Sequence, residues 1–360
     1  MGLVSLKLKN FRCFKELKWQ IETSAIIIQG ANGSGKTSLL EAIHFLSRGR
    51  SFRTHQREIL ISHQTEGLMV YGQVDHQPGH SASLAISYRD GQIKAYLNKL
   101  PVTRITSLAS ALPVQIIDHQ SHALITGGPA YRRRLIDWGV FHKEPHFHEH
   151  WYRYERALRQ RNAIIRQGAA ARVISVWDEE LITAGNIIDT LRRAYVLELA
   201  PVLNELVQRV LPPLIIDIHY KPGWPHELSL EQTLKTGLAG DQQQRMTRHG
   251  PHRADLQLIM QGKPVQNILS RGQEKILGIC LQLAQIVYLG RLIDKSTLVL
   301  VDDIAAELDA SHLERLLNEF KHFNAQLFFT AVNGNLIESH LHGLPHHMFH
   351  VEQGELRQVI

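Results

Sequence analysis

Cysteine is scarce in this chain of 360 residues, because Cys13 and Cys280 are the only two. Two thiols so far apart in the sequence do not make a disulfide framework or a zinc site. Such cysteine usage is typical of proteins in a reducing compartment, so we expect a cytoplasmic protein.

Long apolar runs are lacking too. The strongest, such as residues 298–301, are far shorter than the roughly 20 residues that cross a bilayer, and the N-terminus has no apolar signal core. We therefore expect no membrane partner. Apolar residues make up 44% of the chain and charged residues 21%, and the net charge is +6. This balance is ordinary for a globular protein and permits an anionic partner without requiring one.

A glycine-rich stretch organises the chain. It consists of Gly30, Ala31, Asn32, Gly33, Ser34, Gly35, Lys36 and Thr37, which fits the phosphate-binding P-loop pattern. An apolar, β-branched run at 25–28 predicts a strand before it, and apolar residues at helical spacing over 38–46 predict a helix after it. In such a loop, backbone N–H groups surround an anion at a helix N-terminus. Lys36 is then expected to reach the β- and γ-phosphates of a nucleoside triphosphate, and Thr37 to hold Mg²⁺.

A second part of the site is predicted late in the chain. The apolar strand at 298–301 ends in Asp302 and Asp303, as a Walker B strand does. Asp302 would hold Mg²⁺, directly or through water. Asp303 could orient or deprotonate the attacking water, which makes Lys36 and Asp303 the candidate catalytic residues. Residues 326–330 predict a last core strand.

Between these motifs, two kinds of pattern alternate. Short strands at 69–74, 83–88 and 93–97, separated by turn residues, predict an antiparallel patch. A further strand at 114–117 is followed by the polar Gln120. From about 131 to 211 the apolar residues recur at helical spacing without a long heptad array, which predicts a helical lobe without a coiled-coil arm.

Residues 269–273, Leu-Ser-Arg-Gly-Gln, precede another amphipathic helix. Ser270 is well placed to cap that helix, and the turn is either a second anion-binding site or simply a helix cap. With residues 307–309, this stretch resembles the signature and D-loop of ABC ATPases of the SMC-like branch. Residues 8–12, 128–133, 250–255 and 269–273 together are most similar to the bacterial RecF family, over essentially the whole chain.

The resemblance implies an α/β fold: a P-loop ABC-type ATPase head, with a mixed sheet plus an antiparallel patch, and a second, mainly helical lobe. Lobe I would comprise residues 1–127 and 292–360, and lobe II, carrying the signature, residues 128–291.

The resemblance also implies an ATP-dependent homodimer with weak ATPase activity. The P-loop of one copy would face Ser270, Gly272 and Gln273 of the other across ATP, and Gln120 is the candidate for the Q-loop. Two departures matter: Asp303 stands where most ABC ATPases carry Glu, and Thr330 stands near the usual switch histidine.

The function implied is DNA binding in recombinational gap repair, with RecO and RecR and favouring RecA loading, and links to replication restart and the SOS response. Duplex or gapped DNA would be bound through its phosphates. Basic residues outnumber acidic ones over 131–172, so Arg132, Arg133 and Arg134 are candidate DNA contacts, although a solvated helical face is the alternative. Two other readings are an ABC ATPase subunit serving a transporter and a small-molecule kinase.

Overall fold

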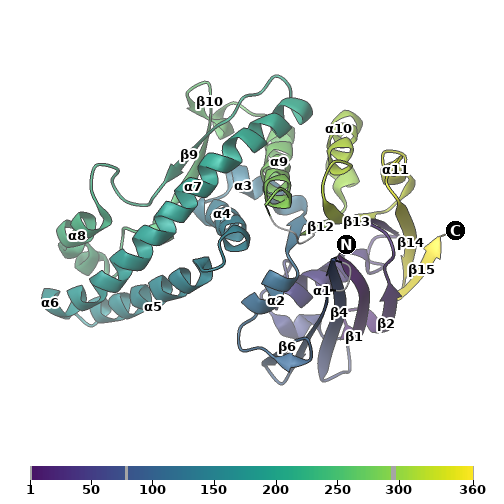
Figure 1. The fold of residues 1–360 in the computed structure, drawn as a ribbon, viewed down its shortest axis with the longest axis horizontal. Coiled ribbons are helices and arrows are strands. Elements are labelled where there is room, and N and C mark those ends of the chain that lie inside the picture. Colours follow the sequence, from purple (N-terminus) through teal and green to yellow (C-terminus); the bar gives the residue numbers. More distant parts are fainter. Residues whose placement is uncertain (1, 78–79, 293–296, 360) are drawn as a thin grey trace. The chain divides into compact units, whose positions relative to one another are not determined.

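The structure is a computed structural model that describes residues 2–77, 80–292 and 297–359. The chain forms two compact units (Figure 1). Unit 1 contains residues 1–121 and 286–360, and unit 2 contains residues 122–285. Each boundary lies a few residues before the predicted one, and the second falls inside helix α9, Arg271–Gly290.

A mostly parallel sheet forms the centre of unit 1. Its strands lie in the order β15-β14-β3-β13-β12-β8. Strands β12, β13, β14 and β15 are labelled in Figure 1. Their bounds are β3 Ala25–Gln29, β8 Val114–Ile117, β12 Thr297–Val301, β13 Ala325–Ala331, β14 His346–Glu352 and β15 Glu355–Val359. Strand β12 is buried along its whole length and pairs in parallel with β13 and β8. The loops that follow the parallel strands therefore meet at one edge, where ligands of such sheets bind.

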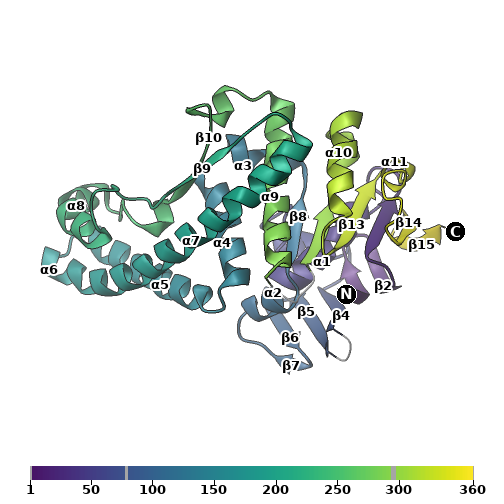
Figure 2. The same ribbon diagram turned by 45° about the horizontal axis from the view of Figure 1, so that its top comes forward.

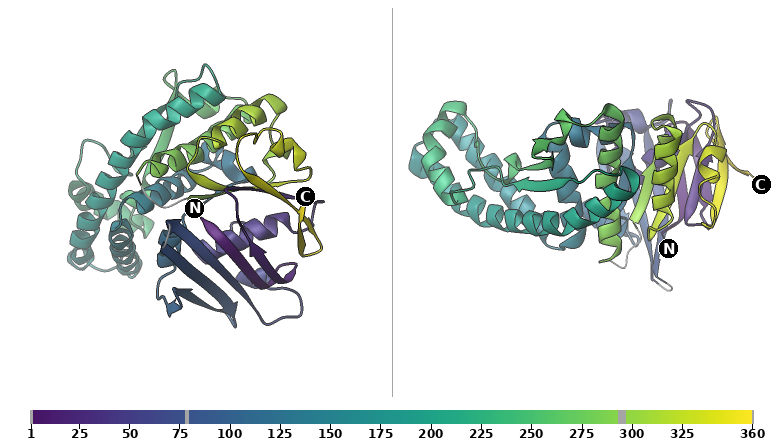
Figure 3. Two further views of the ribbon diagram at one scale, coloured as in Figure 1. Left: turned by 45° about the vertical axis from the view of Figure 1, so that its right-hand side comes forward. Right: turned by 90° about the horizontal axis from the view of Figure 1, so that it is seen from above.

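An antiparallel sheet is the second layer of unit 1 (Figure 3). It has the order β2-β1-β4-β5-β6-β7. The bounds are β1 Leu3–Phe11, β2 Phe14–Gln20, β4 Gly67–Gln77, β5 His80–Arg89, β6 Gln92–Leu97 and β7 Leu100–Pro101. Along β1, Leu6 and Leu8 are buried whereas Lys7 and Lys9 are exposed, which is the alternation of a strand with one solvated face.

Helix α1, Lys36–Arg48, contacts strands of both sheets. Its apolar side chains, such as Phe45, belong to one core cluster with Phe11 of β1, Ile28 of β3 and Leu300 of β12. Burial of this shared apolar face fixes the start of α1 at the edge of the parallel sheet. The other helices of unit 1 are α2 Thr106–Ala111, α10 Ala310–Phe320 and α11 Asn335–Glu338.

Unit 2 is mainly helical, as predicted (Figure 2). Its helices are α3 Ala123–Thr126, α4 Pro129–Lys143, α5 Phe147–Arg166, α6 Ala171–Ile174, α7 Asp178–Val210 and α8 Leu230–Gln244. A small sheet joins β9 Asp217–Lys221, β10 Asp255–Met260 and β11 Lys263–Pro264. Helix α7 packs against α5 and α4 through buried residues such as Leu181, Ile188 and Tyr195.

Candidate nucleotide-binding site

The loop between β3 and α1 has the backbone geometry of an anion-binding turn. Gly33 and Gly35 have φ angles of 80° and 115°, a region that favours glycine. A Cβ atom on Gly35 would lie 2.7 Å from the Cys13 sulfur, so a larger residue would also collide there. These glycines let the loop turn tightly into the first residue of α1.

Several polar groups of this loop suit a bound anion. The backbone N–H groups of Gly33, Gly35, Lys36 and Thr37 make no hydrogen bond to any described residue. The Ser34 hydroxyl oxygen is buried and also has no partner within the described part of the chain. Unsatisfied donors at the positive end of a helix are what a phosphate group requires, so the loop fits the phosphates of ATP.

The Lys36 side chain folds back over the loop. Its ammonium group donates to the carbonyl oxygens of Gly30 at 2.8 Å and Ala31 at 2.9 Å, and the residue is only 7% exposed. Burial lowers the pKa of Lys36, while the nearby carboxylates of Asp303 and Asp302 act in the opposite direction. A cation held above free N–H groups can bind phosphate oxygens without reorganising the loop.

The Asp302 carboxylate, directly after β12, joins α1 and β13 at the edge of the parallel sheet. One oxygen of Asp302 accepts from the Thr37 hydroxyl at 2.9 Å and from the Thr330 hydroxyl at 2.7 Å. The Thr330 oxygen in turn accepts from the backbone N–H of Asp303 at 2.9 Å. Hydroxyl and carboxylate oxygens are the ligands that Mg²⁺ prefers, so Thr37 and Asp302 suit that ion.

Asp303 lies beside the same loop in a left-handed backbone conformation, with φ 49°. Burial raises the pKa of Asp303, and the Lys36 ammonium opposes that shift. A partly buried carboxylate with a raised pKa is a better proton acceptor than an ordinary surface aspartate. Its chemistry therefore suits a general base.

A cavity of about 450 Å³ covers the loop. Lys36, Thr37 and Asp303 line it, which shows that residues far apart in the sequence share one space. Gln120 does not line this cavity; its side chain is exposed after β8. The cavity is also lined by Arg12, Cys13, Arg53, Ile59 and Ile61, and the sequence singled out none of the last four as ligands.

The signature-like residues belong to unit 2. Ser270 is exposed, and its hydroxyl accepts from the backbone N–H of Gln273 at 3.3 Å, while the Gln273 side chain accepts from the Ser270 N–H at 3.0 Å. This reciprocal pair is a capping box at the start of α9. The helix-cap reading is therefore correct, and Ser270 and the exposed Gly272 also remain accessible to a second molecule.

The three candidate DNA contacts differ sharply in availability. Arg132 is only 6% exposed, and its guanidinium pairs with Asp255 at 2.7 Å and donates to the Gly127 carbonyl at 2.7 Å. Arg132 is thus a structural residue in this conformation, which corrects the expectation of a phosphate contact. Arg133 is half-buried and donates to the Ala254 carbonyl. Arg134 is exposed.

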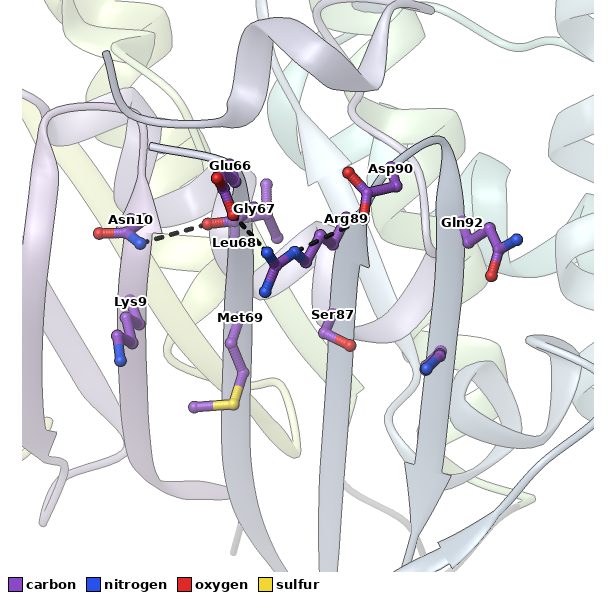
Figure 4. A pocket seen from close by; sticks show the side chains of 11 residues that line it. Lys9, Asn10, Glu66, Gly67, Leu68, Met69, Ser87, Arg89, Asp90 and Gln92 are labelled. Carbon is purple, nitrogen blue, oxygen red and sulfur yellow. Dashed lines mark hydrogen bonds and ion pairs between the residues drawn. The ribbon is translucent and has the colours of Figure 1, made fainter. Parts of the chain in front are cut away.

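A second hollow lies on the solvent face of the antiparallel sheet (Figure 4). Its volume is about 510 Å³, and Lys9 and Lys94 are among the residues that line it. Arg89 lies within it between the carboxylates of Glu66 and Asp90. None of the residues expected to bind ATP or Mg²⁺ lines this hollow.

Comparisons with known proteins match the whole chain. The family model described as RecF/RecN/SMC N terminal domain covers residues 2–356. The DNA replication and repair protein RecF of Shewanella denitrificans is 37% identical over 356 residues, which is 99% of either chain. The protein of the same name from Shewanella sp. is 36% identical over the full length of both chains. The chain belongs to the RecF family. The transporter alternative gains no support from these relatives.

Solved structures show the same fold. The recombination mediator protein RecF of the RecFOR pathway matches this RecF-family chain with a TM-score of 0.89 at 22% identity, covering 99% of this chain and 98% of that one. The Smc head domain of Pyrococcus furiosus matches with a TM-score of 0.60 at 16% identity, covering 100% and 96%. The predicted ATPase-head fold is confirmed. Among the described residues, no helix combines the length and apolar character needed to cross a bilayer.

The Thr330 hydroxyl should contribute measurably to stability. Thr330→Val keeps the shape of this fully buried side chain but removes the donor to Asp302 and the acceptor for the Asp303 N–H. We expect the free energy of unfolding in urea to fall by about 1–3 kcal/mol. Thr236→Val, which makes the same change on the exposed face of α8, should alter it far less. Equal stability of the two variants would show that the Asp302 junction is not structural.

Proposed function

We propose that this RecF-family protein is an ATP-dependent DNA-binding protein of recombinational gap repair and replication maintenance, with weak ATPase activity. The observation that carries the proposal is the hydrogen-bonded junction of Thr37, Asp302 and Thr330 beside a P-loop with free N–H groups. The relatives of known name are DNA replication and repair proteins, which supports DNA as the target.

ATP and Mg²⁺ would bind at the P-loop. Residues 30–37 would surround the phosphates, and Lys36 would exchange its contacts with the Gly30 and Ala31 carbonyls for phosphate oxygens. Thr37 and Asp302 would hold Mg²⁺, which when bound neutralises charge on the phosphates. A solved RecF structure described with ATP has a TM-score of 0.88 to this chain and supports this assignment.

Hydrolysis would depend on Asp303. Its carboxylate lines the cavity next to Lys36 and can accept a proton from a water molecule there. Since Asp is one methylene shorter than the Glu at this position in most ABC ATPases, its reach toward the γ-phosphate is reduced. Slow turnover follows, so ATP would act as a switch whose hydrolysis ends the bound state.

The switch would operate through dimerisation. Ser270, Gly272 and Gln273 are proposed to meet the γ-phosphate bound to a second copy, because Ser270 and Gly272 are exposed at the N-terminus of α9. Loss of the γ-phosphate would remove the ligand that both copies share. Gln120 stays a weaker candidate for the same site, since its side chain is exposed and does not line the cavity.

DNA would be held through phosphate contacts. Arg134 is the best placed of the three predicted arginines, with Arg133 as a partly buried second, whereas Arg132 supports the fold by pairing with Asp255. Duplex or gapped DNA is the proposed ligand. The proposed protein partner is RecR, with RecO and RecA acting in the same pathway. The proposed location is the cytoplasm.

The proposed function predicts that DNA binding depends on ATP. Fluorescence anisotropy with a labelled gapped duplex should show affinity in ATP and Mg²⁺ that weakens steeply as salt rises, because phosphate contacts release counterions. Lys36→Ala should abolish the ATP-dependent part without unfolding the protein. DNA affinity that is the same with and without ATP, or in the Lys36→Ala protein, would contradict the proposal.

The dimer predicts a second, independent result. Sedimentation velocity should show a monomer without ATP and a dimer with a slowly hydrolysed ATP analogue and Mg²⁺. Ser270→Arg places a long cation at the proposed interface and should remove the dimer while leaving nucleotide affinity within about threefold. Arg245→Ala, at the exposed end of α8, is the control and should dimerise normally. An unchanged dimer in Ser270→Arg would refute the arrangement.

A further inference from the structure

Helix α1 contains a buried carboxylate that the proposed chemistry does not use. Glu41 lies in the second turn of α1 after Lys36 and is fully buried, with Leu39, Leu40 and Ala42 of the core beside it in sequence. Burying a charge is costly unless partners compensate it. The partners of Glu41 therefore indicate what the carboxylate does.

Two guanidinium groups and a hydroxyl converge on Glu41. Arg12 donates through its Nε and one terminal nitrogen to the two carboxylate oxygens, each at 2.8 Å. The Ser51 hydroxyl donates to one of these oxygens, and a terminal nitrogen of Arg53 lies 3.6 Å from the other. A two-point arginine pair of this kind fixes both distance and orientation.

These contacts connect three segments that are distant in the sequence. Arg12 lies in the turn between β1 and β2, and its remaining terminal nitrogen donates to the Ile59 carbonyl at 3.0 Å. The Ser51 oxygen accepts from the backbone N–H of Arg53 at 2.8 Å, which shapes the turn after α1. Glu41 thus ties the β1–β2 turn and the segment 51–59 to the helix that begins at Lys36.

The segments tied by Glu41 form one wall of the 450 Å³ cavity. Arg12, Arg53 and Ile59 line that wall, and Lys36 and Thr37 line the same cavity. Because the P-loop takes the phosphates, the part of the cavity next to this wall is left for the nucleoside. Ile59 is 48% exposed and the Arg53 side chain 46%, so apolar and cationic groups face that space.

We propose that Glu41 is a positioning residue for nucleotide binding. The proposal rests on the proposed function. Glu41 holds Arg12, and the cavity wall around Arg53 and Ile59, at a fixed distance from Lys36. The phosphates are bound by the P-loop itself, whose free N–H groups do not involve Glu41. The positioning therefore acts on the nucleoside part of the ligand and not on the triphosphate.

The role of Glu41 can be tested by comparing the affinities of the protein for ATP and for inorganic tripolyphosphate. Calorimetric titration in Mg²⁺ of the full-length protein with Glu41→Gln should show ATP affinity reduced at least tenfold, with tripolyphosphate affinity within about twofold of the wild type. The double variant Arg12→Gln/Glu41→Gln should lose no more ATP affinity than the weaker-binding single variant, because the two residues act as one pair. Equal loss for both ligands, or no loss for ATP, would overturn the proposal.

Two further variants keep the test decisive. If Glu41→Gln is too unstable to titrate, Ser51→Ala can be used instead, because it removes one hydrogen-bond donor to Glu41. This variant should lose about threefold in ATP affinity and keep its tripolyphosphate affinity. Glu66→Gln is the matched control, since Glu66 pairs with Arg89 at the other hollow and does not line this cavity, and the affinities for ATP and tripolyphosphate should both be unchanged. A wild-type protein that binds neither ligand would instead refute the proposed function itself.

Discussion

The Asp302 carboxylate is the interaction on which the site depends. It accepts hydrogen bonds from Thr37 at the start of α1 and from Thr330 near the end of β13, so it connects the residue after β12 to the neighbouring strand and to the helix that follows the P-loop. The same oxygen that organises these loops is suited to an Mg²⁺ ion. The fold and ligand binding therefore share one group, so a change in the ligand would affect α1, β13 and the loop after β12 together.

The charges around the P-loop form a balanced set. Lys36 is held by two carbonyl oxygens, and its charge opposes the burial that raises the pKa of Asp303. Arg12 and Arg53 also line the cavity, and the buried carboxylate of Glu41 offsets the charge of Arg12 and lies close to Arg53. An entering triphosphate would bring negative charge to the P-loop, where the N–H groups of Gly33, Gly35, Lys36 and Thr37 have no hydrogen-bond partner among the described residues. Binding is thus directed to one end of the cavity.

Features encoded by neighbouring residues could be predicted from the sequence. The strand, loop and helix around residues 30–37 were predicted because apolar spacing and glycine positions are local signals. Features that depend on residues far apart in the sequence could not be predicted in this way. Arg132 lies in a basic stretch, but its partner Asp255 is far away in the sequence, so burial was not foreseen. The extent of strand β2, Phe14–Gln20, likewise depends on its pairing with β1, which includes Phe11 opposite Phe14.

We propose that the P-loop and Asp302 together form one Mg²⁺-dependent nucleotide site. Calorimetric titration of a slowly hydrolysed ATP analogue into the purified protein, with Mg²⁺ and then with a chelator, tests it most directly. The affinity of the wild-type protein for the analogue should fall at least tenfold when Mg²⁺ is removed, and the Lys36→Ala variant should show a loss of the same size. In the Asp302→Ala variant, the affinity should no longer depend on Mg²⁺. Equal affinity in all of these conditions would contradict it.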